Sequence, residues 1–165
     1  MRFSVEQSFA APLADVGAAL CDPGFLARLG QLPKLGGARL LEQRREGGLV
    51  VQRVRYAFVA ELSPAVRAVV EPDRLTWVEE STTDLAMHRT EWRIVPDHYG
   101  NLLRCSGTFR LEARGPSSTR RIAEGDVQVR VPFVGGKVER AIVSGLRDHA
   151  RLEEEALASW LDSSD

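Results

Sequence analysis

The histidines of this chain, which could transfer a proton near neutral pH, stand in separate predicted elements. His88 belongs to an alternating stretch, Leu85 to Val95, and shares its more apolar face. His149 lies on the apolar side of the last predicted helix. A neutral imidazole facing a closed pocket can orient a ligand or exchange a proton near neutral pH. A histidine that is hydrogen-bonded within a core is the more common case, so both interpretations remain open.

The cysteines and histidines show no spacing typical of a metal site or a disulfide framework. Cys21 and Cys105 are far apart and form no C-x-x-C motif, which is typical of a protein in a reducing compartment. Cys105 lies on the inward face of its predicted strand. We therefore interpret it as a small core residue and not as a nucleophile. Because zinc needs three or four converging ligands, we expect no metal and no cofactor.

A glycine pair before Lys137 superficially suggests a phosphate-binding loop. The P-loop motif requires an earlier glycine and a hydroxyl after the lysine, where this chain has Val138. We therefore interpret Gly135 and Gly136 as small residues that let the first turn of a helix pack closely against a sheet.

The elements that must position these residues are mostly strands. Apolar residues alternate with polar ones, as in Phe3, Val5 and Phe9, which predicts strands with one buried face. The seven predicted strands are Arg2 to Ala10, Ala38 to Arg45, Leu49 to Glu61, Arg74 to Thr82, Leu85 to Val95, Leu102 to Ala113 and Arg120 to Val131. The segment Ser63 to Val70 is ambiguous between helix and strand. Short polar turns join the last six strands, so the sheet must be antiparallel.

Three helices complete the predicted order. Two short ones follow the first strand, one after Ala11-Pro12 and one from Phe25 to Gln31. The last helix runs from Pro132 to Leu161 and would be about 45 Å long. Its apolar stripe consists of Val134, Val138, Ile142, Gly145, His149, Leu152, Ala156 and Trp160. The whole chain, 1–165, is thus predicted to be one α+β domain: a helix-grip fold in which a seven-stranded curved antiparallel sheet wraps around the long C-terminal helix.

This fold predicts a space between the sheet and the last helix. Large side chains on inward strand positions would either stack on a flat ligand there or fill the space themselves. Gly107 and Gly145 favour an open space, because small residues leave room. The candidate cavity-lining residues are Tyr56, Phe58, Trp77, His88, Trp92, Cys105, Phe109, Ile142, Gly145 and His149.

The element order and three sequence stretches resemble the START-like superfamily, which includes birch-pollen-type allergens, polyketide cyclases and lipid-transfer domains. The stretches are RFSVEQSFAAPLADVGAALCDPGFLARL, LTWVEESTTD with MHRTEWRIVPD, and GDVQVRVPFVGGKVER. Together they are similar to a bacterial branch described as a domain of unknown function. The resemblance implies a cavity that holds an apolar or amphipathic small molecule, but it implies no reaction.

Composition excludes several other partners. With 22 basic and 23 acidic residues the net charge is −1, and the arginines are interleaved with acids, so no nucleic-acid surface is predicted. No apolar run approaches the roughly 18 residues of a membrane span, and the N-terminus has no signal-peptide core. We therefore expect a cytoplasmic protein with no integral membrane segment.

Three hypotheses for function follow from these observations. The first is a binding module that carries or senses a hydrophobic small molecule of the lipid, polyketide or isoprenoid class, with His88, His149 and Tyr56 orienting it. The second is a cyclase- or aromatase-like enzyme in which a histidine or tyrosine moves a proton. The third is a ligand-free interaction module of the chaperone-activator type, which predicts a packed core and an exposed apolar patch. The lack of a sharp catalytic constellation favours the first.

Overall fold

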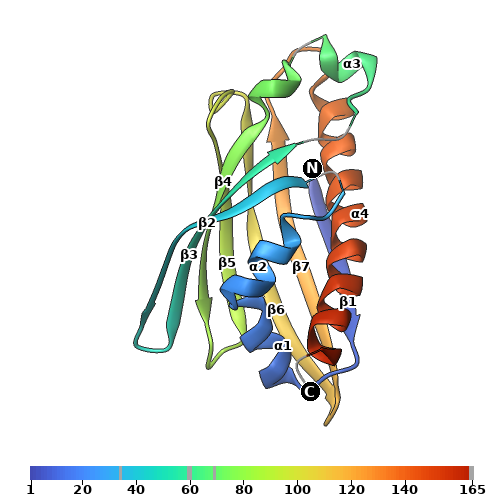
Figure 1. Cartoon of the computed structure of the whole chain (residues 1–165). Helices are drawn as coiled ribbons and strands as arrows, with labels where there is room; N and C mark the ends of the chain where they lie inside the picture. Colours follow the sequence, from blue (N-terminus) through green and yellow to red (C-terminus); the bar gives the residue numbers. More distant parts are fainter. Residues whose placement is uncertain (34, 59–60, 69, 164–165) are drawn as a thin grey trace.

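The computed structural model describes residues 1–33, 35–58, 61–68 and 70–163. The elements in chain order are β1 (Arg2–Phe9), α1 (Leu13–Leu20), α2 (Pro23–Leu29), β2 (Leu35–Glu46), β3 (Leu49–Phe58), α3 (Pro64–Arg67), the 3-10 turn η1 (Pro72–Arg74), β4 (Thr76–Asp84), β5 (Arg89–Pro96), β6 (Leu103–Gly115), β7 (Ser118–Val129) and α4 (Gly135–Asp162). Figure 1 shows the long α4 beside a curved sheet, with α1 and α2 near its C-terminal half. The predicted α+β helix-grip fold is confirmed.

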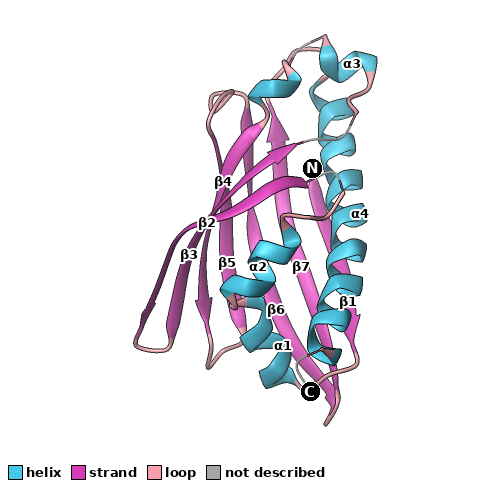
Figure 2. Ribbon diagram, in the orientation of Figure 1, coloured by secondary structure: helices cyan, strands magenta, loops and turns pink. Residues whose placement is uncertain are grey.

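The sheet has the strand order β1-β7-β6-β5-β4-β3-β2, and every neighbouring pair is antiparallel. Only the pairing of β1 with β7 joins strands that are distant in sequence. The helices α1, α2 and α4 lie on one side of this sheet (Figure 2). Strand alternation places Val50, Gln52, Val54 and Tyr56 on the buried face of β3. The inner face of the sheet therefore carries one polar residue among apolar neighbours on this strand.

Two hydrophobic clusters stabilise the fold. The first joins α1, α2 and the end of α4 to β3, and its completely buried members are Val16, Phe25 and Leu157. The second joins β1, β5, β6 and β7 to the N-terminal half of α4, around Val127 and Val143. The long helix thus packs against β1 and β7 at one edge of the sheet, while α1 contacts β6 and β7 and α2 contacts β2 at the opposite edge. This division decides where a cavity remains.

The hairpin between β4 and β5 differs from the prediction. The sequence predicts a tight link at Thr83-Asp84 and a strand from Leu85, but β4 continues to Asp84 and β5 begins at Arg89. The Asp84 Oδ1 atom accepts hydrogen bonds from the N–H groups of Ala86 and Met87, at 3.0 and 2.9 Å. This side-chain bonding stabilises a turn over the strand conformation. His88 therefore lies in the turn, with φ 51°, rather than within the strand.

The start of the last helix also differs. The sequence predicts a helix from Pro132, but the helix begins at Gly135, after an exposed Phe133 with φ 65°. The predicted close packing of the first turn holds for Gly135, where a Cβ atom would lie 2.4 Å from the Val129 carbonyl oxygen. Gly136 has no such neighbour, since a Cβ there would meet only Arg140 at 3.8 Å.

Two predicted segments fall partly outside the described residues. The strand expected from Leu49 to Glu61 is β3, which ends at Phe58, and residues 59–60 lie outside the description. The ambiguous segment from Ser63 to Val70 begins with α3, and residue 69 lies outside the description. The Ser63 side chain accepts the Val66 N–H, which is a typical helix N-cap.

Candidate functional site

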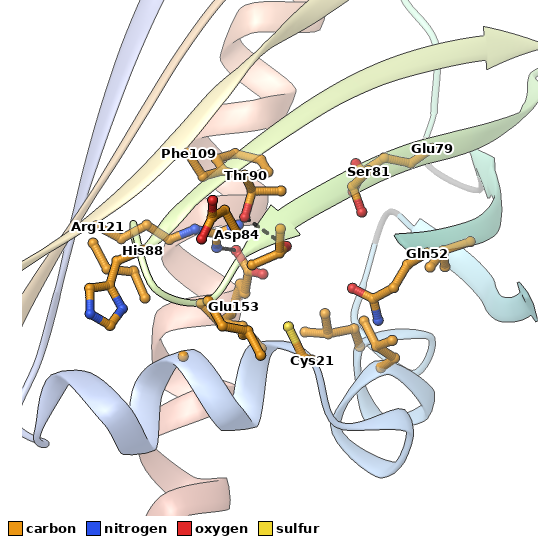
Figure 3. Close-up of a pocket in the computed structure, with 18 of the residues that line it drawn as sticks. Cys21, Gln52, Glu79, Ser81, Asp84, His88, Thr90, Phe109, Arg121 and Glu153 are labelled. Atoms are coloured by element: carbon orange, nitrogen blue, oxygen red, sulfur yellow. Dashed lines mark hydrogen bonds and ion pairs between the residues drawn. The ribbon is translucent and has the colours of Figure 1, made fainter. Parts of the chain in front are cut away.

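A cavity of about 80 Å³ lies between the middle of the sheet and the short helices (Figure 3). Its lining consists of Gly17, Leu20, Cys21, Leu26, Leu29, Gln52, Val54, Tyr56, Glu79, Ser81, Thr83, Asp84, Leu85, His88, Thr90, Phe109, Leu111, Arg121 and Glu153. Among the described residues of α4, only Glu153 belongs to this lining. The cavity is therefore covered by α1 and α2, whereas the sequence predicts one beneath the long helix.

Three of the predicted cavity residues, Tyr56, His88 and Phe109, line this space. Trp77 lies next to it, stacked on Tyr56 with 5.9 Å between the ring centroids. Phe58 is half-buried near the end of β3. Of the three aromatic residues of β3 and β4, Tyr56 lines the cavity, and Trp77 contacts the cavity only through Tyr56.

The other predicted residues lie in the second hydrophobic cluster or on α4. Trp92 stacks on Phe109 at 5.4 Å, and Cys105 packs in the same cluster, where burial raises the pKa of its thiol to about 12. Ile142 packs against this cluster, and His149 is half-buried, with no hydrogen-bond partner for its Nδ1 atom among the described residues. The remaining predicted residue, Gly145, has open space beside it, since a Cβ atom there would have no neighbour within 4 Å.

Gly107 does not create room for a ligand. A Cβ atom at this position would lie 2.0 Å from the Glu124 carbonyl oxygen and 2.8 Å from the Trp92 side chain. The glycine is needed because Gly107 and Gly125 face each other across β6 and β7, and Phe3 fills the space over Gly125. The expectation that Gly107 leaves an open space is therefore wrong, since aromatic side chains occupy it.

A buried ion pair between Arg121 and Glu153 closes one end of the cavity. The Arg121 Nη1 atom lies 2.8 Å from Glu153 Oε2, and both residues are less than 10% exposed. Gln7 links the pair, because it accepts from Arg121 Nη1 at 3.2 Å and donates to Glu153 Oε2 at 3.2 Å. The guanidinium also lies 4.1 Å above the Phe109 ring. This arrangement joins β1, β7 and α4 through polar contacts inside the fold.

The surroundings of Glu153 determine its charge. Burial raises the pKa of its carboxyl, but Arg121, His149 and the hydrogen bond from Gln7 together hold it below its ordinary value. Burial lowers the pKa of the neighbouring His149. At neutral pH the pair is therefore a carboxylate and a guanidinium, which neutralise each other.

A second polar group lies across the sheet from this pair. Glu79 is half-buried on the inner face of β4, where its paired neighbours are Val54 and Ile94. No hydrogen bond or ion pair joins its carboxyl to another described residue. Burial, and then the charge of Glu153, raise the pKa of Glu79 to about 7, although Arg121 opposes this. Glu79 can therefore exchange a proton within the cavity near neutral pH.

Gln52 and Ser81 lie beside Glu79 and complete what we call the β3–β4 polar cluster, defined as Gln52, Glu79 and Ser81. Gln52 pairs with Ser81 across the two strands, and Glu79 is two residues before Ser81. Figure 3 shows the three side chains at one side of the cavity. Gln52 is only 5% exposed, yet its Nε2 has no hydrogen-bond partner among the described residues. The cluster thus offers an unused donor and an unused carboxyl.

Tyr56 supplies a neutral hydroxyl at the same cavity. Burial, and then the charges of Glu79 and Glu153, raise the pKa of this phenol well above its ordinary value. The hydroxyl therefore stays protonated at neutral pH and can serve as a hydrogen-bond group. Of the groups named in the catalytic hypothesis, Tyr56 is thus unsuited to act as a base.

The sequence also indicates that the polar residues of the site face inward, although they interrupt the apolar pattern of their strands and helix. Gln7 has the same parity as Phe3, Val5 and Phe9, which predicts an inward side chain. Glu153 follows His149 by four residues, on the same side of the helix. Strand alternation likewise places Glu79 two residues from Trp77. If polar residues on apolar faces had been treated as candidate site residues, Gln7, Glu79 and Glu153 would all have been identified.

The titration of Glu79 predicts a pH-dependent stability. A carboxyl with a raised pKa favours the folded state fully below its unfolded value of about 4.5, and this contribution is lost as the pH rises through about 7. We expect the wild type to lose about 2–3 kcal/mol relative to Glu79→Gln between pH 5 and pH 8. Urea unfolding at both pH values measures this difference. Parallel pH profiles for the two proteins would contradict it.

Neither a metal cluster nor a membrane helix is found in the part of the chain that the structure describes. Within it, no group of three or more histidine, cysteine or acidic side chains is placed to hold a metal ion. No helix among the same residues is long and apolar enough to cross a membrane.

Comparison with known proteins places the chain in a family. Residues 4–161 match the family described as "Protein of unknown function (DUF2505)". The chain belongs to this family. No curated protein matches the sequence. Membership in DUF2505 agrees with the resemblance to a domain of unknown function, and it assigns no activity.

Solved structures confirm that this DUF2505 chain has the START-like fold. TTHA0849 from Thermus thermophilus is 18% identical with a TM-score of 0.72, over 100% of this chain and 99% of that one. The Zhui aromatase/cyclase from Streptomyces sp. R1128 is 16% identical with a TM-score of 0.65, over 98% and 93%. A START superfamily protein from Mycobacterium smegmatis is 17% identical with a TM-score of 0.58, over 99% of each chain. At these identities the likeness concerns the fold alone.

Proposed function

We propose that this protein binds a small amphipathic molecule in the cavity beneath α1 and α2. The observation that supports this function is the mixed lining, in which the β3–β4 polar cluster lies among apolar side chains such as Leu26 and Phe109. Ligand sites are typically apolar spaces with a few polar groups that fix the orientation of the ligand. Apolar burial would supply affinity, and the polar cluster would select the ligand.

The size of the cavity limits its occupant. At about 80 Å³ it is smaller than typical ligand sites of roughly 300–1,000 Å³. As it stands, it accommodates a ligand of few heavy atoms or one end of a longer molecule. A lipid, polyketide or isoprenoid chain would have to displace α1 and α2. Those helices have only eight and seven residues and depend on packing for their stability, so their displacement is less costly than moving α4.

The experiment that tests this function is native mass spectrometry of the protein purified from its native host, followed by solvent extraction. We expect a reproducible bound mass that is lost on extraction. A matched variant is Gly17→Met, because Gly17 lines the cavity and a Cβ there meets only Leu111 at 3.7 Å. The methionine chain should fill the cavity, reducing ligand occupancy at least tenfold while α1 stays folded.

Ala18→Met on the exposed side of α1 is the control, and it should leave occupancy unchanged. Equal occupancy in wild type and Gly17→Met would contradict binding at this cavity. An empty wild-type protein that also takes up no apolar fluorescent probe would contradict the function itself.

A second candidate function is acid–base catalysis in the same cavity. The observation that favours it is Glu79, a carboxyl with a pKa of about 7, beside the Gln52 amide donor, which has no partner in the part of the chain that the structure describes. Incubating the extracted ligand with wild type and Glu79→Gln tests it, since only the wild type should convert the ligand. The ligand-free interaction hypothesis predicts a core without a cavity, and the space beneath α1 and α2 argues against it.

A further inference from the structure

The unused hydrogen-bonding groups of the cavity indicate the chemistry of its ligand. Gln52 is only 5% exposed, and its Nε2 donor is unpaired among the described residues. A buried donor without a partner is unfavourable, because it has lost its hydrogen bonds to water and gained none in return. Arg121 Nε, at the other end of the cavity, is a second buried donor without a described partner. Two unused donors favour a ligand that carries a hydrogen-bond acceptor.

The charges around the cavity favour a neutral acceptor. Arg121 and Glu153 form an ion pair, so neither attracts a charged ligand strongly. An ammonium group would pair with an ionised Glu79, but it has no acceptor for Gln52. A carboxylate ligand would place another negative charge near Glu153, and near Glu79 whenever that carboxyl is ionised, at a cost in a buried site. A neutral carbonyl oxygen avoids both problems.

Building on the proposed binding function, we propose that the ligand presents a neutral carbonyl oxygen that accepts hydrogen bonds from Gln52 Nε2 and from the protonated carboxyl of Glu79. The apolar body of the ligand would then contact the leucines of α1 and α2 and the ring of Phe109. Ser81, which pairs with Gln52, lies next to the same position.

The proposal makes binding depend on the protonation of Glu79. The titratable and charged groups that line the cavity with it are Cys21, Tyr56, Asp84, His88, Arg121 and Glu153. Ionised Glu79 offers no donor and repels the carbonyl oxygen, so the ligand should bind best below the pKa of about 7. If only the protonated form binds, affinity should fall about 30-fold between pH 5.5 and pH 8.5.

The test uses two probes with one carbon skeleton, butanone and sec-butylamine. The full-length protein, labelled with 15N and 13C, is titrated with each at pH 5.5, 7 and 8.5, following the signals of Phe109 and Leu111 by NMR. Butanone should bind more tightly than the amine, and its affinity should fall at least tenfold over this range. Gln52→Leu should weaken butanone binding about 2–10-fold, the value of one neutral hydrogen bond.

Two variants assign the pH dependence. Glu79→Gln keeps a donor but cannot ionise, so butanone binding should become independent of pH. A pH-independent affinity in this variant would assign the pH dependence to Glu79 and not to another group that lines the cavity. Glu80→Gln makes the same change on the outer face, where Glu80 pairs with Arg93, and it should reproduce the wild-type profile.

The outcomes separate this inference from the function on which it rests. Tighter binding of the amine, or a pH-dependent butanone affinity that persists in Glu79→Gln, would overturn the carbonyl assignment and leave ligand binding intact. If neither probe shifts the cavity signals while both variants give folded spectra, the carbonyl assignment and the cavity as a binding site both fail.

Discussion

Replacing Arg121 with methionine is expected to lower the free energy of unfolding by about 3–5 kcal/mol, because Glu153 would then be a buried charge without its partner. Arg121 and Glu153 are 7% and 9% exposed, so water cannot replace the lost ion pair. Without Arg121, burial should raise the pKa of Glu153, and the carboxyl should take up a proton more easily. The loss should therefore be smaller at pH 5 than at pH 7 in urea unfolding experiments.

The double variant Arg121→Met with Glu153→Met distinguishes two costs: that of leaving Glu153 as an unpaired buried charge, and that of losing the ion pair itself. Apolar replacement of both members of a buried ion pair is often neutral or stabilising, so this protein should recover most of the lost stability. Arg120→Met is the matched control, because the neighbouring side chain pairs with Glu112 on the outer surface and should change stability little. A single Arg121→Met variant as stable as the wild type would contradict the prediction.

Replacing Phe25 with alanine is the second change with a large expected effect, a destabilisation of about 3–5 kcal/mol. Phe25 on α2 is completely buried and packs against Trp160 of α4, with 5.9 Å between the ring centroids. The seven-residue α2 is too short to be stable without such packing. Its amides should therefore exchange hydrogen faster, and Leu26 and Leu29 should cover the cavity less firmly.

Urea unfolding and amide hydrogen exchange measure the two parts of this prediction. Phe133→Ala is the control, since Phe133 is fully exposed and its removal should leave both measurements unchanged. Equal exchange rates for α2 in wild type and Phe25→Ala would show that the other contacts of α2 are sufficient to hold it in place.

Local interactions made most of the fold predictable from the sequence. The turn between β2 and β3 depends on Gly47 and Gly48, whose φ values of 56° and 81° suit glycine. The start of α2 depends on Asp22, which accepts a hydrogen bond from the Gly24 N–H at 2.7 Å. Strand alternation assigned the faces of β1 and β3 in the same way. Each of these features involves residues within a few positions of one another.

The candidate site could be predicted only in part, because alternation shows which side chains face inward but not what covers them. The sequence placed Tyr56 and Phe109 on inner faces, and it also placed Trp92 and Cys105 there. The two pairs differ because α4 packs along β1 and β7, so its cluster fills the space around Trp92 and Cys105. The cavity remains over the central strands β3, β4 and β5, beneath residues of the short helices such as Gly17 and Leu26.

The chain by itself thus determined the order of the elements along the sequence, the inward faces of strands such as β1 and β3, and the helices that flank the sheet. Tertiary structure alone decided which polar residues are in contact. Gln7, Arg121 and Glu153 are separated by up to 146 positions in the sequence. They come together only because β1 pairs with β7 and α4 packs on both strands. Tertiary structure also decided that Glu79 has no such partner among the described residues. The physical reason is that a buried polar group is stabilised by partners brought from distant parts of the chain, and local sequence carries no record of them.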